Sequence, residues 1–290
     1  MQKVIEKAEV LIEALPYIQR FRGDAVVVKF GGSAMEDKLN VQTVLKDVAF
    51  MECVGLRPVL VHGGGKAISQ RMKDAGLRPV FVKGLRVTDE DSIKIVQQVL
   101  NEEVNPEVVQ TLEDFGCKAR GIHGEHIFTV VKHTEKDEQT GEELDWGYVG
   151  EVVAVDLEPV RAYLQAGITP VITPLGTDKD RRLYNVNADE AAAAVARELK
   201  ARKLVFLSDV PGLLENREDP TSILSTLKLS EVEDLIGRGV IDGGMLPKVN
   251  GAIGALKAGV KKTHIIDARM PHSLLLELFT DKGVGTEIVQ

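Results

Sequence analysis

The run Ala25–Ser33, AVVVKFGGS, is the feature that most constrains how this chain can fold. Its three consecutive valines are typical of a buried β-strand. The strand is predicted to end near Lys29, and the two glycines that follow allow a backbone to approach a ligand closely. Ser33 with Glu36 fits a capping box, so a helix is expected to start there. Together these features describe an anion site with free amides, a positive helix end and one cation, although an ordinary strand–helix turn has the same order.

Composition and charge argue against several classes of protein. The chain has 290 residues, with 36 Lys plus Arg against 44 Asp plus Glu, and its net charge of −8 argues against nucleic acid as a partner. No apolar run reaches the roughly 18 residues that span a bilayer, and the N-terminus lacks the apolar stretch of a secretory signal. Cys53 and Cys117 lack CxxC spacing, which predicts a reducing compartment and no metal site. We therefore expect a soluble, cytoplasmic protein that binds neither nucleic acid nor membrane.

Short apolar strands alternate with helical segments along the whole chain. This alternation predicts an α/β fold with an open, mostly parallel central sheet that carries helices on both faces. In such sheets ligands bind beyond the carboxyl ends of the strands, which is where Lys29, His62 and Asp209 fall.

Two regions differ from this pattern. Residues 119–122, 127–132 and 149–155 are expected to form a β-meander, with a polar hairpin tip at 134–145. Residues 176–184 are polar and break the apolar pattern, so they are the best candidate for a boundary between two lobes.

A helix is predicted over residues 3–21, ahead of the first strand, and Pro16 should kink it. The helix either lies on its own domain or crosses to another subunit, and the sequence alone does not separate these alternatives. Its apolar positions, four and three residues apart in alternation, are Val4, Ala8, Leu11, Leu15 and Ile18.

Three further loops carry candidate ligand-binding residues. The HGGG run at 62–65 follows a short strand, and consecutive glycines are best explained by a ligand against the main chain. Arg86 is a candidate partner for a carboxylate, although an exposed arginine without a ligand is the more common case. Asn187 is suited to cap the alanine-rich helix that follows it, which leaves Asn185 and Asp189 in or beside the first turn.

Several familiar catalytic signatures are missing from the sequence. No G-x-G-x-x-G follows a strand, which weakens a dinucleotide-dependent oxidoreductase. No G-x-x-x-x-G-K-[ST] is present, so a P-loop enzyme is not expected. The chain also lacks H-E-x-x-H and G-x-S-x-G, which leaves little support for a hydrolase.

Six elements remain, and their order along the chain is informative: KFGGS (29–33), HGGG (62–65), GLRVTD (84–89), NVNAD (185–189), LSDVPGL (207–213) and GGMLPKV (243–249). With them the chain resembles the amino acid kinase family over nearly its whole length. HGGG, GLRVTD and NVNAD look most like the branch that phosphorylates N-acetyl-L-glutamate. The resemblance implies a three-layer αβα sandwich with two lobes and an N-terminal kinked helix. The expected parts are an oligomerisation helix at 1–22, an acetylglutamate-binding lobe at 23–180 and a nucleotide-binding lobe at 181–290, with 23–290 as one kinase domain.

The resemblance implies ATP-dependent phosphorylation of the side-chain carboxylate of N-acetyl-L-glutamate to an acyl phosphate, an early step of arginine biosynthesis. Such a carboxylate is already ionised at neutral pH, so the reaction needs charge neutralisation and positioning more than a general base. By resemblance, Lys29 and Lys248 would stabilise the transferring phosphoryl group and Asp189 would orient both lysines. MgATP is the expected co-substrate, with Mg²⁺ held through the nucleotide phosphates and no protein metal site.

The family pattern also implies binding residues. Acetylglutamate is expected at Gly64, Gly65, Arg86, Asn185 and Asn187, with Arg86 on the α-carboxylate. The phosphates and the nucleotide are expected at Gly31, Gly32, Ser208, Asp209, Gly212, Leu213, Gly243 and Gly244.

Regulation is implied as well. Members of the family that arginine inhibits carry a similar kinked helix before the first strand and use it to link three dimers into a hexamer. Tyr17, His264, Glu277, Gly283 and Gly285 match the arginine site of those enzymes, with Glu277 facing the guanidinium. We therefore expect arginine as an inhibitor and a homo-hexamer, a trimer of dimers. Similar hexamers of photosynthetic lineages bind a PII-type signalling protein, but the sequence does not reveal the lineage.

Two other functions stay open at this point. One is a related kinase that acts on a different small acid, such as an aminoadipate derivative, on the same fold. The other is a non-catalytic regulator that binds the metabolite and signals through its oligomer, although the presence of both lysines and Asp189 argues against lost catalysis. Lys66 departs from the family pattern, which more often has proline there, and we expect it to be a surface lysine.

Overall fold

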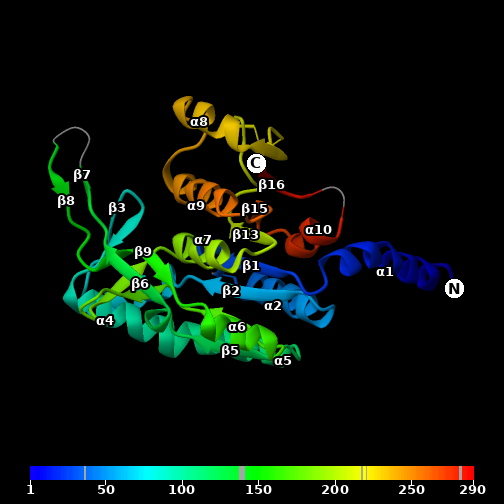
Figure 1. Cartoon of the computed structure of the whole chain (residues 1–290), viewed down its shortest axis with the longest axis horizontal. Coiled ribbons are helices and arrows are strands. Elements are labelled where there is room, and N and C mark those ends of the chain that lie inside the picture. The colour runs from blue at the N-terminus through cyan, green and yellow to red at the C-terminus, as the bar shows by residue number, and fades with distance from the viewer. Residues whose placement is uncertain (36, 137–140, 217, 220, 281–282) are drawn as a thin grey trace.

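An eight-stranded sheet crosses the molecule, and helices pack on both of its faces (Figure 1). The computed structural model describes residues 1–290 except 36, 137–140, 217, 220 and 281–282. In spatial order the strands are β14 (Thr226–Lys228), β16 (Thr286–Val289), β15 (Lys262–Asp267), β13 (Lys203–Ser208), β1 (Ala25–Phe30), β2 (Arg57–His62), β10 (Thr169–Ile172) and β5 (Ala119–Ile122).

Most neighbours in this sheet are parallel. Every pairing from β15 across to β5 is parallel, whereas β16 is antiparallel to β15 and parallel to β14. The predicted open and mostly parallel sheet is therefore confirmed. The carboxyl ends of β1, β2 and β13 share one edge of the sheet, as the sequence pattern requires.

The helices form two layers, one on each face of the sheet. One layer consists of α6 (Glu158–Gln165), α7 (Ala188–Leu199), α8 (Leu229–Gly237) and α9 (Leu246–Lys257). The other consists of α2 (Lys38–Cys53), α3 (Gly65–Asp74), α4 (Glu90–Gln98), the π-helix η2 (Val99–Val104), α5 (Asn105–Asp114) and α10 (Ser273–Phe279). Figure 1 shows α7 and α9 on one side of the strands and α2 on the other. The three-layer αβα architecture is confirmed.

The valine run of β1 explains how one strand serves both layers. Val27 packs into the core on the α7 side, and Val26 and Val28 pack into the core on the α2 side. Successive side chains of a strand point to opposite faces, so an uninterrupted apolar run is what a strand covered on both faces requires.

The first helix after β1 starts later than the sequence predicts. Gly32–Met35 forms a 3-10 turn, η1, and α2 begins at Lys38 with Asp37 as its N-cap. The side chain of Asp37 accepts a hydrogen bond from the backbone N–H of Leu39 at 2.7 Å. The expected helix start at Ser33 is therefore wrong, and the Glu36 half of the expected capping box lies outside the described residues.

Four short strands form a smaller closed group beside the main sheet: β6 (Phe128–Lys132), β9 (Val149–Val155), β11 (Leu175–Thr177) and β12 (Leu183–Val186). Strands β6 and β9 pair antiparallel, as the meander prediction requires. Strand β5 does not join them, because it pairs parallel with β10 at the edge of the main sheet. The meander prediction is therefore wrong for residues 119–122.

Two hairpins extend from this region: β3 (Val80–Val82) with β4 (Leu85–Val87), and β7 (Glu135–Lys136) with β8 (Glu143–Leu144). The second agrees with the polar hairpin predicted at 134–145, although residues 137–140 lie outside the described part of the chain.

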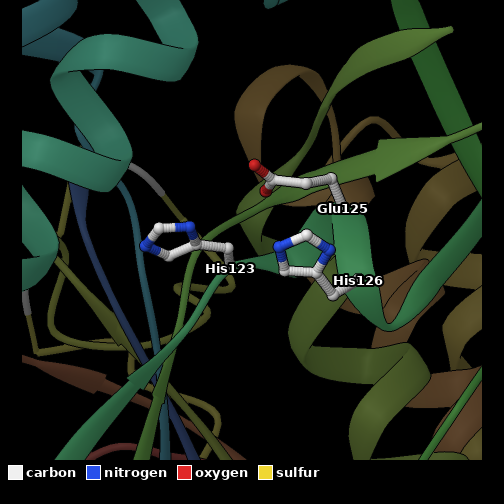
Figure 2. A group of neighbouring side chains, drawn as sticks. All are labelled: His123, Glu125 and His126. Carbon is white, nitrogen blue, oxygen red and sulfur yellow. The ribbon is translucent and has the colours of Figure 1, made fainter.

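A short 3-10 turn, η3 (Gly124–His126), follows β5. It carries Glu125 and His126, and His123 stands directly before it (Figure 2). The backbone N–H of Gly124 donates to the side-chain oxygen of Thr173 at 2.9 Å, which fastens the turn to the end of β10.

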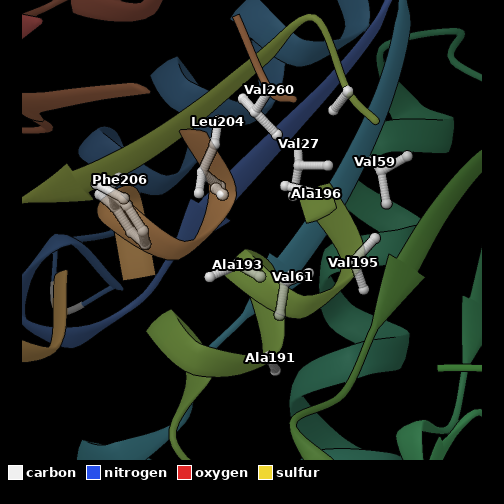
Figure 3. Close-up of a cluster of buried hydrophobic side chains, with 14 of the residues drawn as sticks. Val27, Val59, Val61, Ala191, Ala193, Val195, Ala196, Leu204, Phe206 and Val260 are labelled. Carbon is white, nitrogen blue, oxygen red and sulfur yellow. The ribbon is translucent and has the colours of Figure 1, made fainter. Parts of the chain in front are cut away.

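Small side chains let α7 approach the sheet and α9 closely. Ala191, Ala193 and Ala196 of α7 are almost completely buried against strand residues such as Val27 and Val61 (Figure 3). On α9, a Cβ at Gly251 would lie only 3.1 Å from the Cβ of Ala193. This contact fixes the two helices side by side, so their first turns lie together near the end of β1.

Helix α1 (Gln2–Phe21) extends from one end of the molecule in Figure 1, and Pro16 lies inside it. Phe21, at its end, is buried, whereas Val10, Leu11 and Ile12 are 63%, 68% and 67% exposed. In the part of the chain that the structure describes, none of the helices combines the length and the apolar character needed to cross a membrane.

Candidate active site

Two lysines meet at one buried carboxylate beyond the carboxyl end of β1. Nζ of Lys29, on β1, lies 3.0 Å from Oδ1 of Asp189, and Nζ of Lys248, on α9, lies 3.0 Å from Oδ2. Burial would raise the pKa of Asp189, but the charges and hydrogen bonds of the two lysines outweigh it and hold the pKa below its usual value. An ionised carboxylate between two ammonium groups leaves one net positive charge, which can attract an anion.

The start of α7 holds Asp189 in this position. Asn187 is the N-cap, and its side-chain oxygen accepts hydrogen bonds from the backbone N–H groups of Asp189 at 2.8 Å and Glu190 at 3.4 Å. The predicted cap at Asn187 is therefore confirmed. Because Asp189 lies in the first turn, its carboxylate also stands at the positive end of the helix, where a negative charge is stabilised.

The two glycine-rich turns lie against each other at this edge of the sheet. A Cβ at Gly31 would lie 3.1 Å from the Cα and the N of Gly63, so the turns after β1 and β2 approach backbone to backbone. Gly63 N–H donates to the carbonyl of Phe30 at 2.7 Å. Gly32 has φ +68°, a left-handed conformation that a side chain would strain.

The second glycine of the HGGG run, Gly64, is also confined. A Cβ at Gly64 would lie 2.7 Å from Cδ2 of Leu100 on η2. Gly65 is the first residue of α3, so the run leads directly into a helix N-terminus. The edge of the sheet therefore presents main-chain amides and a positive helix end beside Lys29.

Arg86 is a buried cation at the HGGG turn. It lies on β4 and is 6% exposed, and its Nη2 donates to the carbonyl of Gly65 at 2.7 Å and to the hydroxyl of Ser69 at 2.8 Å. Its guanidinium also lies 4.7 Å from the centre of the Phe81 ring. Burial lowers the pKa of Arg86, and no carboxylate of the described residues offsets this burial. A guanidinium in such a place is suited to bind an anionic ligand.

Asn185 reaches the same region through the backbone. The carbonyl of Thr88, directly after β4, accepts from Tyr148 N–H at 2.7 Å, and the carbonyl of Tyr148 accepts from Asn185 N–H at 2.9 Å. The structure thus connects Arg86 and Asn185 through neighbouring strands, while Asn187 and Asp189 follow Asn185 at the start of α7.

A cavity of about 470 Å³ lies beside Lys248. Its lining includes five of the residues expected at the nucleotide: Ser208, Asp209, Gly212, Leu213 and Gly244. Gly243 lines the adjoining cavity of about 1040 Å³, together with Gly244 and Asn187. Gly31 and Gly32 lie apart from this lining, at the turn after Lys29.

A separate cavity, of about 580 Å³, lies between α1, α10 and the edge of the main sheet. The five residues expected at the arginine site all line it: Tyr17, His264, Glu277, Gly283 and Gly285. The same lining carries further charged side chains, among them Arg20, Arg202, Lys203, Lys262 and Glu287.

Glu277 is at the centre of the charged groups in this cavity between α1 and α10. Nδ1 of His264 lies 2.7 Å from Oε1 of Glu277, and Oε2 accepts from the backbone N–H of Val284 at 2.8 Å. Burial opposes ionisation of Glu277, but these contacts outweigh it and lower its pKa. Burial also lowers the pKa of Lys203 to about 8. The cavity therefore offers a carboxylate and several cations to one ligand.

Sequence reasoning missed a buried pair behind the HGGG turn. The side-chain amide of Asn105 lies 3.0 Å from Nε2 of His62, and Nδ1 of His62 lies 2.8 Å from the carbonyl of Gly63. Asn105 has no motif of its own, so only the packing of α5 reveals the contact. The structure also brings together His123, Glu125 and His126, three residues of types that ligate metals, although no metal site is expected from the sequence.

Fold and site together define an α/β protein with two lysines, one buried carboxylate and two glycine turns at the carboxyl edge of its parallel sheet. A family model described as "Amino acid kinase family" matches residues 24–267, and the chain belongs to this family. It is similar to the acetylglutamate kinase of Akkermansia muciniphila, at 47% identity over 99% of this chain and 97% of that one. It is also similar to the acetylglutamate kinase of Carboxydothermus hydrogenoformans, at 48% identity over 99% of each chain. The chain is a kinase.

Solved structures agree with this fold. N-acetylglutamate synthase from Neisseria gonorrhoeae, in complex with coenzyme A and N-acetyl-glutamate, superposes with a TM-score of 0.84 at 28% identity. This match covers 98% of the present chain but 63% of the synthase chain. The same synthase in complex with coenzyme A and L-arginine gives a TM-score of 0.80 at 27% identity, over 97% of this chain and 65% of that chain.

Proposed function

We propose that this kinase transfers the γ-phosphoryl group of ATP to the side-chain carboxylate of N-acetyl-L-glutamate and releases ADP and the acyl phosphate. The acetylglutamate kinases that it resembles along almost their whole length support this substrate. The acceptor is already ionised at neutral pH, so the site needs no general base for this reaction. Its task is to bring an anion against a polyanion and to stabilise the charge of the group in transit.

Lys29 and Lys248 supply that charge. One carboxylate, Asp189, aligns both ammonium groups from opposite sides, so that they are in place before substrate binds. Amides of Gly31, Gly32 and Gly64 donate to the phosphoryl oxygens as the bond to the leaving ADP lengthens and the bond to the carboxylate forms. Because the lysines and the glycine amides are already in place, these groups need to move little during the reaction.

Arg86 binds the α-carboxylate of acetylglutamate. The support is its burial beside the HGGG turn without a carboxylate partner among the described residues. Gly65, Asn185 and Asn187 complete the substrate site in this proposal. With the α-carboxylate fixed at Arg86, the side-chain carboxylate of the substrate extends toward Lys29.

ATP lies in the cavity beside Lys248, with Ser208, Asp209, Gly212, Leu213, Gly243 and Gly244 around it. The cavity volume of about 470 Å³ and its position next to a catalytic lysine support this assignment. Mg²⁺ enters with the ATP phosphates and neutralises part of their charge. A cytoplasmic location fits a kinase that uses ATP, and residues 23–180 and 181–290 act as the acetylglutamate and nucleotide lobes.

The single observation that carries this function is the convergence of Lys29 and Lys248 on Asp189. The test is release of ADP from MgATP by the purified chain in the presence of N-acetyl-L-glutamate, with glutamate and an N-acetylated aminoadipate as comparison substrates. We expect release that depends on N-acetyl-L-glutamate and is many-fold slower with the others. Faster turnover of a longer acid would identify a related kinase, and no turnover of any acid would identify a metabolite-binding regulator.

We also propose that arginine inhibits the enzyme from the cavity between α1 and α10. The presence of Glu277 and several cationic side chains in the lining of one cavity supports a ligand that carries both a guanidinium and a carboxylate. The gonococcal synthase, whose structure was determined with L-arginine, has the same fold. The exposed apolar side chains of α1 support contact with another subunit, and hence a hexamer built as a trimer of dimers. A PII-type protein is a further candidate partner of such a hexamer.

A further inference from the structure

Three side chains that could ligate a metal gather at the turn after β5. His123, Glu125 and His126 place one ligand atom each within 4.8 Å of the others. Figure 2 shows the carboxylate of Glu125 and the two imidazole rings around a common space. The two rings are stacked, with centres 6.1 Å apart and planes 15° apart. Glu125 and His126 lie on η3 and His123 is its N-cap, so none of them belongs to the group of Lys29, Lys248 and Asp189.

Neighbouring side chains fix Glu125 but satisfy only one of its oxygens. Oε1 accepts hydrogen bonds from the amides of Asn101 at 2.7 Å and Gln97 at 3.3 Å. Oε2 is buried and has no hydrogen-bond partner among the described residues. An unpartnered carboxylate oxygen is costly to bury, so its position beside two imidazoles points to a cation that it would ligate.

The backbone of the turn is also held. The hydroxyl of Thr177, on β11, donates to the carbonyl of Glu125 at 3.2 Å, and Gly124 N–H donates to Thr173. These contacts orient the ligands without occupying the ring nitrogens of either histidine. Amides that hydrogen-bond a ligating carboxylate are the usual outer contacts of a metal site.

We propose that His123, Glu125 and His126 bind one divalent transition-metal ion of the zinc class. Two imidazole nitrogens and one carboxylate oxygen are ligands that suit Zn²⁺, Co²⁺ or Ni²⁺, whereas Mg²⁺ and Ca²⁺ prefer an all-oxygen set. Bonds of about 2.1 Å require the three donors to move slightly closer together. Because His126 is exposed, water occupies the remaining coordination positions.

Bound metal would stabilise the contacts of the turn η3 with η2 and β11. Asn101 lies on the π-helix η2, whose Leu100 packs against Gly64, and Thr177 lies on β11. The ion therefore stabilises the edge of the main sheet and, through η2, the wall behind the HGGG turn. This inference does not depend on the proposed substrate, because metal binding is measured without turnover.

The test is metal binding by the full chain after removal of bound metal with a chelator. We expect calorimetric titration with Zn²⁺ to show one equivalent of binding that a large excess of Mg²⁺ does not displace. Co²⁺ in the same site should give visible absorption bands with no sulfur charge-transfer band, since neither cysteine takes part. His123→Ala, His126→Ala and Glu125→Gln should each weaken binding by at least about 10-fold, and H272N, which removes an imidazole elsewhere, should not.

Two results would overturn the site. One is a wild-type chain that takes up no Zn²⁺ at micromolar concentration, and the other is equal uptake by the wild type and the three variants. Circular dichroism of each variant shows whether it is folded, and Glu125→Gln keeps the shape of the side chain in case either alanine variant is not. In a folded wild type, saturating Zn²⁺ should raise the melting temperature, and this rise should vanish in Glu125→Gln.

Discussion

Asn105 donates its side-chain amide to Nε2 of His62 over 3.0 Å, and this contact fixes the proton of His62 on Nδ1. The same amide also donates to the carbonyl of Val171 at 2.9 Å, so its orientation is defined by two acceptors. Nδ1 of His62 then donates to the carbonyl of Gly63 at 2.8 Å, which ties a fully buried, neutral imidazole to the glycine turn. Burial lowers the pKa of His62 to about 4.

This neutral histidine makes stability depend on pH. In the unfolded chain His62 takes up its proton near pH 6.5, whereas in the folded chain it does so only near pH 4. The neutral imidazole therefore contributes fully to the free energy of unfolding above pH 6.5, and this contribution is lost as the pH falls toward 4. Asp47 has the opposite effect on the free energy of unfolding, because burial raises its pKa from 3.8 to about 6. As the pH falls, the folded chain takes up the proton of Asp47 before the unfolded chain does, so this residue stabilises the fold between pH 6 and 4. The two contributions oppose each other between about pH 4 and 6.

We therefore predict that Asp47→Asn steepens the loss of stability on acidification. The free energy of unfolding should fall by about 1 kcal/mol more per pH unit between pH 6 and 4 than in the wild type. Urea unfolding at a series of pH values measures this difference. Asp114→Asn, at an exposed carboxylate, is the control, and parallel pH profiles of all three proteins would contradict the prediction.

Removal of either Lys29 or Lys248 should cost far more activity than stability. Lys29→Ala and Lys248→Ala are each expected to lower kcat by about 10²- to 10³-fold, by analogy with loss of one oxyanion donor. The remaining lysine still pairs with Asp189, so the fold should persist. Steady-state ADP release measures the effect, with Lys94→Ala on the exposed face of α4 as the control. A kcat within a few-fold of the wild type in either lysine variant would remove the basis of the proposed mechanism.

The sequence predicted the parts of the fold that depend on local patterns. The valine run predicted β1 because a strand covered on both faces needs continuous apolar residues, and Asn187 predicted the start of α7 because its cap is local. The meeting of Lys29 and Lys248 at Asp189 followed only from the family resemblance. The structure adds its cause, the close contact of α7 and α9 at Gly251.

Other features depend on contacts between distant segments, which no local pattern contains. The 3-10 turn at Gly32–Met35 delays α2 to Lys38, and the capping pattern at Ser33 gave no sign of this delay. Strand β5 reads like a meander strand, but its pairing partner is β10, far along the chain. The burial of Arg86 needs Met72 and Phe81 around it, so the sequence alone left its exposure open.

Arg86 variants should separate substrate binding from the chemical step. Arg86→Lys keeps the positive charge but loses the bidentate hydrogen bonds that a guanidinium donates to a carboxylate. The KM for N-acetyl-L-glutamate should therefore rise by about 10- to 100-fold. The KM for MgATP should stay close to that of the wild type, since the nucleotide cavity is separate. Arg120→Lys, at an exposed arginine paired with Glu113, is the matched control. Equal rises in both KM values would place Arg86 in a general structural role.

The contact between the two glycine turns predicts a strong effect of one added methyl group. In Gly31→Ala the new Cβ would meet the backbone of Gly63 at 3.1 Å, and neither turn can yield without moving the ends of β1 or β2. We expect kcat/KM to fall by at least about 10-fold, because small displacements of positioned groups are costly. At Gly237, near the end of α8, an added Cβ meets nothing within 4 Å, so Gly237→Ala is the control. Similar activity of the two variants would show that the turns tolerate the displacement.

Regulation can be separated from catalysis with two variants of the cavity between α1 and α10. Glu277→Gln removes the negative charge that would face a guanidinium, and we expect arginine to lose at least about 10-fold in inhibitory potency while kcat without arginine stays near the wild-type value.

A chain that starts at Gly23 lacks Tyr17 and the exposed apolar face of α1, so light scattering should show a mass of one third of the hexamer, a dimer. This shortened chain should also be less sensitive to arginine, because one wall of the cavity is missing. Thr226→Ala, which changes a neutral residue of the same cavity lining, is the control for Glu277→Gln. Unchanged mass and unchanged inhibition in the shortened chain would show that α1 takes part in neither assembly nor regulation.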